Sequence, residues 1–278
     1  MFAAKGISRL PFPVLYGISN LLRFLFCDVF GYRKAVIQDN FKRAFPEMES
    51  KQRNQYIRDF YLNLTDIMVE SLKSLTISEK SLRKRVVLHN RELLEQLHQS
   101  EKGVMMVMGH YTNFEWVALA MPLLVPHKTF AVYGRIKNPK VNTFVVDMRE
   151  RFGLKLFQMR ETYDFMLSQS EKAPLYLFMA DQAPHKGKIK YRAPFFGIPT
   201  PTHLGAEKLA KECNLAVVFI NVKRTRRGHY EITPKLLFEN PNVTKPYEIT
   251  DTHVAELEAM IRENPAHWLW SHKRWKNL

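Results

Sequence analysis

The fold is decided by the stretch GVMMVMGHYTNFE, residues 103–115. Its apolar run, residues 104–108, is typical of a strand that is buried on both faces of a parallel sheet. The run ends at Gly109, and the polar residues after it predict a turn and then a helix that begins near Thr112. His110 is therefore expected at the carboxyl end of a central strand.

Strand-like and helix-like segments alternate on both sides of this stretch. The expected strands are Val86–Leu88, Val104–Met108, Thr129–Tyr133, Leu154–Phe157, Leu175–Met179 and Ala216–Val222. The helical patterns between them are Arg91–Gln99, Asn113–Leu124, Pro139–Phe152, Tyr163–Glu171 and Leu204–Cys213. Such alternation predicts an α/β fold, a mostly parallel central sheet flanked by helices. An antiparallel strand, His229–Thr233, and a helix, Val254–Glu263, are expected to complete it.

The chain before the sheet is expected to form an N-terminal helical segment, residues 1–45, that associates with a membrane. Residues 10–30 are rich in Leu, Phe and Val, but Arg23 and Asp28 interrupt them. A spanning helix needs ~20 apolar residues with few charges, so a helix lying in the headgroup region fits better than a span. The alternative is a buried helix of a soluble protein. Residues 46–278 then form the main domain, opening with an amphipathic helix from about Ser50.

The composition excludes several classes of protein. The chain has 278 residues with 42 lysines and arginines against 27 aspartates and glutamates, a formal charge of +15 that favours anionic partners. A mean hydropathy of −0.28 excludes a polytopic membrane protein. Two cysteines exclude a disulfide framework, and the common zinc, nucleotide and nucleic-acid motifs are missing from the sequence. We therefore expect no metal, no cofactor and no nucleic-acid partner.

His110 and Glu115 are the first candidates for catalysis. With His110 in the turn and Glu115 in the first helical turn, the two side chains can approach each other. A carboxylate on one imidazole nitrogen fixes the tautomer and leaves the other nitrogen free to take a proton from a hydroxyl. The alternative is structural, because Thr112 and Glu115 also match a capping box, in which Glu115 only satisfies a backbone donor.

Polar residues also follow other predicted strands. Asp181 and Gln182 come directly after one strand, and Arg135 comes shortly after another. Because the carboxyl ends of parallel strands share one edge of a sheet, we expect His110, Arg135 and Asp181 to line one crevice. The alternative is that Asp181 and Gln182 only cap a turn before Pro184.

The stretch 182–206 is basic and contains no acid. Its prolines argue against both a helix and a central strand, so we expect an irregular loop. Lys186 and Lys188 in such a loop suit phosphate or carboxylate groups, and Thr200 or Thr202 is expected to cap the helix that follows. The alternative is a solvated basic loop.

Four segments in this order resemble the lysophospholipid acyltransferase superfamily, and within it the Kdo-dependent lipid A late acyltransferase family (lauroyl or myristoyl acyltransferases). They are HYTNFE at 110–115, DQ at 181–182, APFFGIPTPTHLG at 193–205 and WLWSHKRWK at 268–276. The resemblance covers nearly the whole chain, from NFKRAFP at 40–46 to the tail, and it implies a glycerolipid acyltransferase-like fold. By composition alone, the tail suits an interfacial belt, an anion clamp or a segment packed over the core.

The resemblance implies an O-acyltransferase that moves a fatty acyl chain from an acyl carrier protein thioester, or acyl-CoA, to a hydroxyl of a glycolipid, most simply a lipid A precursor. His110 and Glu115 match the family's catalytic dyad, and Asp181 matches its DQ motif. Arg135 and the pair Arg149 and Arg151 match basic positions that meet phosphates or stabilise the site. The resemblance also implies work at the cytoplasmic face of the inner membrane, by peripheral attachment or a single N-terminal anchor.

Other readings stay open at this point. The acceptor can be an aminolipid or a mannosylated phosphoinositide, because the motifs do not separate acceptors. An acyl thioesterase would use the same dyad to activate water. A non-enzymatic protein that binds anionic surfaces would need only the net positive charge and the aromatic, basic tail.

Overall fold

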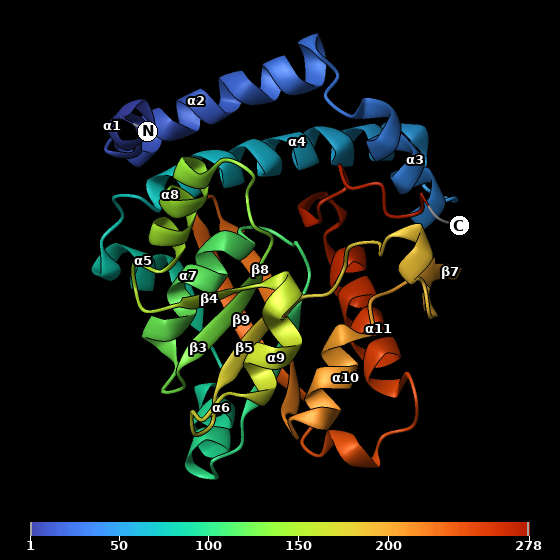
Figure 1. Ribbon diagram of the computed structural model, residues 1–278. Helices are drawn as coiled ribbons and strands as arrows, with labels where there is room; N and C mark the ends of the chain where they lie inside the picture. The colour runs from blue at the N-terminus through green and yellow to red at the C-terminus, as the bar shows by residue number, and fades with distance from the viewer. Residues whose placement is uncertain (1, 277) are drawn as a thin grey trace.

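A mostly parallel sheet forms the centre of the computed structural model, which describes residues 2–276 and 278 (Figure 1). Within these residues its seven strands have the order β1-β9-β8-β2-β5-β3-β4, and every neighbouring pair is parallel except β8 and β9. The strands are β1 (Val86–Leu88), β2 (Val104–Met108), β3 (Thr129–Tyr133), β4 (Lys155–Gln158), β5 (Leu175–Met179), β8 (Ala216–Arg226) and β9 (His229–Phe238). The predicted fold class is confirmed.

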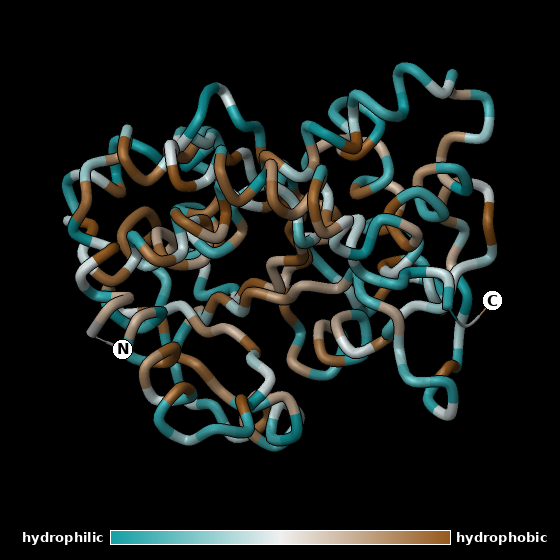
Figure 2. Tube along the Cα trace, turned by 90° about the horizontal axis from the view of Figure 1, so that it is seen from above, coloured by the Kyte–Doolittle hydropathy of each residue, from teal (hydrophilic) through white to brown (hydrophobic). Residues whose placement is uncertain are grey.

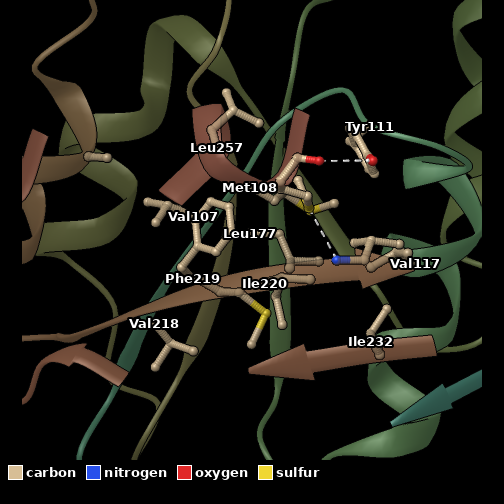
Figure 3. Close-up of a cluster of buried hydrophobic side chains, with 14 of the residues drawn as sticks. Val107, Met108, Tyr111, Val117, Leu177, Val218, Phe219, Ile220, Ile232 and Leu257 are labelled. Carbon is tan, nitrogen blue, oxygen red and sulfur yellow. Dashed lines mark hydrogen bonds between the residues drawn. The ribbon is translucent and has the colours of Figure 1, made fainter. Parts of the chain in front are cut away.

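The strand β2 lies between β8 and β5 in the middle of the sheet. All five of its residues are buried, as its unbroken apolar sequence predicts. Figure 3 shows part of the core around it, where Val107 and Met108 lie near Phe219, Ile220 and other apolar side chains. The tube of Figure 2 likewise has apolar stretches through its middle and hydrophilic chain along much of its edge.

Helices flank the sheet and provide the apolar faces that cover it (Figure 1). After the N-terminal layer they are α5 (Glu79–Arg85), α6 (Arg91–Gln99), α7 (Phe114–Leu124), α8 (Pro139–Arg149), α9 (Thr162–Leu167), α10 (Gly205–Glu212) and α11 (Glu248–Glu263). Short 3₁₀ turns lie at Met159–Glu161, Lys186–Lys188, Pro241–Val243 and Pro265–His267. The helix predicted from Val254 thus begins six residues earlier, and β9 runs five residues beyond its predicted end.

The N-terminal layer consists of α1 (Phe2–Ser8), α2 (Phe12–Phe24), a π-helical turn (Leu25–Val29), α3 (Lys34–Ala44) and α4 (Ser50–Lys73). Figure 1 shows α2 lying along α4 on the outside of the molecule. Within the described chain, one helical stretch, Phe12–Val29, is long and apolar enough to span a membrane by its length and composition. The boundary at residue 45 stays a prediction.

Residues 182–206 are more regular than the sequence predicts. They contain a short antiparallel hairpin of β6 (Arg192–Phe195) and β7 (Ile198–Pro201), so the prediction of an irregular loop is wrong for this part. The prolines are tolerated because this two-stranded ribbon lies outside the central sheet.

The aromatic tail packs over the core, which is one of the three options that its composition left open. Trp268, Trp270 and Trp275 are all buried. The ring of Trp270 stacks on Phe41 of α3 with centroids 4.1 Å apart, and Asn40 donates a hydrogen bond to the carbonyl of Trp270 (2.8 Å). The last residues of the chain therefore join the N-terminal layer to the sheet domain.

Candidate active site

His110 and Asp181 come together at the carboxyl edge of the sheet. Strands β2 and β5 are parallel neighbours in register, with Met108 opposite Met179, so the residues that follow them lie side by side. The Oδ1 atom of Asp181 lies 2.6 Å from Nδ1 of His110. Its Oδ2 atom accepts hydrogen bonds from the backbone N–H of His110 and from Nε1 of Trp268, both at 2.8 Å.

Gly109 allows this close approach. A Cβ atom at residue 109 would lie 2.6 Å from Cδ1 of Leu257 and 3.3 Å from Oδ2 of Asp181. A larger residue would push the turn away from the carboxylate. The glycine therefore serves the contact between β2 and the loop after β5.

Asp181 is buried, the His110 side chain is 16% exposed, and each partner changes the pKa of the other. Burial lowers the pKa of His110, but the charge and hydrogen bond of Asp181 outweigh it, so the pKa of His110 is raised. Burial raises the pKa of Asp181, but the charge and hydrogen bonds of His110 and the bond from Trp268 bring it well below its usual range. Asp181 therefore stays ionised and stabilises the imidazolium form of His110.

Glu115 lies near His110 but is bound to another residue. Its carboxylate accepts two hydrogen bonds from Arg149, at 2.9 Å from Nε and 2.5 Å from Nη2. Among the described residues, the His110 ring has hydrogen-bond contacts with Asp181 and Gln182. The direct pairing of His110 with Glu115 expected from the sequence is therefore replaced by pairing with Asp181, although the charge of Glu115 also raises the pKa of His110.

The capping-box alternative for Glu115 is also wrong. The cap of α7 is Asn113, whose Oδ1 accepts from the backbone N–H of Trp116 at 2.9 Å. Thr112 has a φ of 46°, in the left-handed region, and so lies in the turn before the helix. The first turn of α7 instead presents Phe114, whose ring forms a T-shaped contact with the His110 ring, with centroids 4.8 Å apart.

A pocket of about 710 Å³ opens beside His110. Its polar lining residues include His110, Glu115, Arg149, Gln182 and His203. Most of the remaining wall is apolar and consists of Phe114, Ala118, Ala131, Val132, Tyr133, Gly134, Ile136, Leu154, Leu156, Met159, Tyr163, Phe178, Met179, Ala180, Gly205, Ala206 and Leu209, with Arg160, Thr162 and Lys208 completing it. The arrangement places a proton-accepting imidazole in the wall of a space suited to an alkyl chain.

The three predicted arginines have different surroundings. Arg149 lines the pocket as the partner of Glu115. Arg151 donates to the carbonyls of Ser74 and Ile77 and thus fixes the end of α4 rather than a substrate. Arg135 is exposed and is not among the residues that line the pocket.

Lys186 and Lys188 lie on an exposed 3₁₀ turn after Asp181 and do not line the pocket either. Thr200 and Thr202 are buried, so they do not contact a ligand at the surface. Thr200 accepts a hydrogen bond from Nε1 of Trp275 at 2.9 Å, and Thr202 donates to the carbonyl of Thr200. The prediction that one of them caps α10 is wrong, because Leu204 is the N-cap residue and its side chain makes no capping bond.

The sequence did not predict what two residues of the site do, Trp268 and His203. Trp268 holds Asp181 through its indole N–H, and His203 lines the pocket. The tail sequence singled out Trp268 as unusual but did not indicate a partner 87 residues away. For metals, the described residues contain no group of three or more His, Cys, Asp and Glu side chains placed to bind an ion.

The site therefore belongs to an α/β protein in which a histidine paired with a buried carboxylate lines a largely apolar pocket. Residues 1–277 match the profile of the family described as bacterial lipid A biosynthesis acyltransferase, and the chain belongs to this family and is an acyltransferase.

Three relatives agree with this assignment. A lipid A biosynthesis palmitoleoyltransferase of Escherichia coli K12 is 23% identical over 274 residues, covering 96% of this chain and 87% of that protein. A lipid A biosynthesis lauroyltransferase of the same organism is 18% identical over 276 residues, covering 97% and 88%. A lipid A biosynthesis acyltransferase of Haemophilus influenzae is 22% identical over 239 residues, covering 84% and 72%.

Proposed function

We propose that this acyltransferase moves a fatty acyl chain from an acyl carrier protein thioester to a hydroxyl of a lipid A precursor, with His110 as the general base. The observation that carries the proposal is the placement of His110, paired with the buried Asp181, in the wall of the largely apolar pocket. The pocket suits the alkyl chain of the donor, and His110 stands where a thioester carbon would meet an acceptor hydroxyl.

In the proposed reaction Nδ1 of His110 stays on Asp181 while Nε2 takes the proton of the acceptor hydroxyl. The oxygen then attacks the thioester carbonyl and forms an ester as the carbon–sulfur bond breaks. The imidazolium returns its proton to the leaving thiolate, so atoms and charges balance. The substrate supplies the nucleophile, and the reaction needs no serine or cysteine of the protein.

Arg149 and Gln182 are the donors we propose for the negative charge that develops on the carbonyl oxygen. Both line the pocket, and Nε2 of Gln182 lies 3.4 Å from Nε2 of His110. Glu115 is proposed as the second carboxylate of the site. It fixes the guanidinium of Arg149 with two hydrogen bonds and adds negative charge near His110.

We further propose that the protein works at the cytoplasmic face of the inner membrane with α2 lying along the surface. Only 11% of the stretch Phe12–Val29 is buried. Its exposed apolar side chains face away from α4, whereas Ser19 and Tyr16 bind carboxylates of α4. A helix with polar contacts toward the protein and apolar residues outward suits insertion into a headgroup layer. The exposed apolar residues of this region are Ile7, Val14, Leu21, Phe24, Val29, Phe30 and Tyr32.

The proposal is tested by assaying transfer from an acyl carrier protein thioester to a lipid A precursor in detergent micelles. We expect His110→Ala to lower kcat by ~10²–10⁴-fold, the usual contribution of a general base. The matched control is His89→Ala, which replaces an exposed histidine directly after β1 and should keep the parent rate. Parent-like transfer by His110→Ala would remove His110 from the mechanism, and free fatty acid without acylated lipid would identify a thioesterase.

A further inference from the structure

Helix α4 carries two carboxylates that are entirely buried, Asp66 and Glu70, one helical turn apart. Burying an ionised group is costly unless hydrogen bonds or opposite charges compensate for it. Asp66 is compensated by two guanidiniums, since Arg224 and Arg227 bind it at 2.6 Å and 2.5 Å. It also accepts a hydrogen bond from Ser19 of α2 at 2.6 Å.

Glu70 is held by hydroxyl and amide groups of three different elements. Its Oε1 atom accepts from the hydroxyl of Tyr16 in α2 at 2.9 Å. Its Oε2 atom accepts from Nδ2 of Asn113, the cap of α7, and from the hydroxyl of Tyr230 in β9, both at 2.6 Å. One carboxylate of α4 therefore connects the outer helix α2 with the start of α7.

The start of α7 is also where the candidate active site lies. Asn113 uses its Oδ1 atom to cap the helix at Trp116, and Nε1 of Trp116 donates to the backbone carbonyl of Glu70 at 2.9 Å. The two residues between Asn113 and Trp116 are Phe114, against the His110 ring, and Glu115, bound to Arg149. Both polar atoms of the Asn113 side chain therefore form hydrogen bonds: the nitrogen donates to Glu70, and the oxygen caps α7.

We propose that Glu70 is a positioning residue that couples the seating of α2 on α4 to the geometry of the first turn of α7, and hence to His110 and Glu115. The inference rests on the proposed function and goes beyond it, because it makes α2 part of the support of the active site as well as a membrane contact. If α2 leaves α4, Glu70 loses the Tyr16 hydroxyl and is opened to water. The bond that orients Asn113 then weakens, and the first turn of α7 loosens.

The first test exchanges the donor and the acceptor of the hydrogen bond between Asn113 and Glu70. Asn113→Asp keeps a good N-cap residue but places two carboxylates against each other. We expect kcat in micelles to fall about tenfold with the KM for the acyl donor unchanged. Adding Glu70→Gln reverses the donor and acceptor, because the new amide nitrogen donates one hydrogen to the new carboxylate and its oxygen still accepts from Tyr16. Its second hydrogen goes to the Tyr230 oxygen, which changes from donor to acceptor. This double variant should regain most of the parent kcat.

The second test removes one hydroxyl from α2. Tyr16→Phe keeps the ring and deletes the bond to Glu70. Tyr61→Phe is the matched control, because the Tyr61 hydroxyl of α4 also binds the chain that precedes α4, at the carbonyl of Tyr32 before α3 (2.7 Å), but does so away from Glu70. We expect only Tyr16→Phe to lower kcat and to speed hydrogen exchange of the backbone amides of Trp116 and Val117.

The inference is overturned if folded Asn113→Asp keeps the parent kcat, if the double variant shows no recovery, or if Tyr16→Phe and Tyr61→Phe behave alike. The exchange experiment needs no substrate. If the parent protein transfers no acyl chain, the proposed function is wrong. The amide exchange rates at Trp116 and Val117 would still decide whether α2 and α7 are coupled.

Discussion

At the scale of single residues, the bond between His110 and Asp181 determines how much base is present at a given pH. The negative charge of Asp181 favours the imidazolium, so the pKa of His110 lies above its ordinary value of about 6.5. A general base must be neutral before it accepts a proton. The parent enzyme should therefore gain activity as the pH rises through this raised pKa.

Asp181→Asn should shift this rise of activity with pH, the acid limb of the pH profile, to lower pH. Burial lowers the pKa of His110, and without the Asp181 carboxylate less counteracts this effect. The pKa of His110 therefore falls, and a larger fraction of the molecules has a neutral imidazole in weak acid. The plateau of kcat/KM should nevertheless drop ~10²–10⁴-fold, because an amide no longer stabilises the imidazolium. The measurement is kcat/KM between about pH 5 and pH 9, with Asp59→Asn on the exposed side of α4 as the control. An acid limb that stays in place would separate Asp181 from the titration of His110.

At the scale of elements, the apolar strands and the positions of their ends follow from the sequence. Residues 104–108 are apolar without a break, and β2 is buried throughout. The sheet edge at which His110 and Asp181 meet could be predicted for the same reason. Their direct contact could not, because it depends on β2 and β5 being neighbours in the order of the sheet. The pairing of Glu115 with Arg149 could not be predicted either, because Arg149 lies 34 residues further along the chain.

Helix α2 provides the prediction that belongs to this scale. Leu21 and Phe24 are 59% and 48% exposed, so replacing them should leave the fold intact. Leu21→Asp and Phe24→Asp should each weaken binding to anionic phospholipid vesicles by about tenfold or more, since each removes an inserted apolar side chain and adds a negative charge. Vesicle sedimentation measures this effect. The control is Val243→Asp, which makes the same change at an exposed residue of a turn packed on α10; equal losses in all three variants would contradict attachment through α2.

At the scale of the whole molecule, the protein has a formal net charge of +15, and its proposed donor arrives on an acidic carrier protein. Opposite net charges speed encounter, and salt weakens this attraction as the screening length falls from about 14 Å at 50 mM to about 4 Å at 500 mM. We expect kcat/KM with the acyl carrier protein thioester to fall about tenfold or more over this range. The matched substrate is an acyl-pantetheine thioester, which places the same chain in the pocket without charge and should be nearly insensitive to salt. If both donors respond to salt equally, the positive charge acts elsewhere in the cycle, and the recognition of an acidic carrier has to be abandoned.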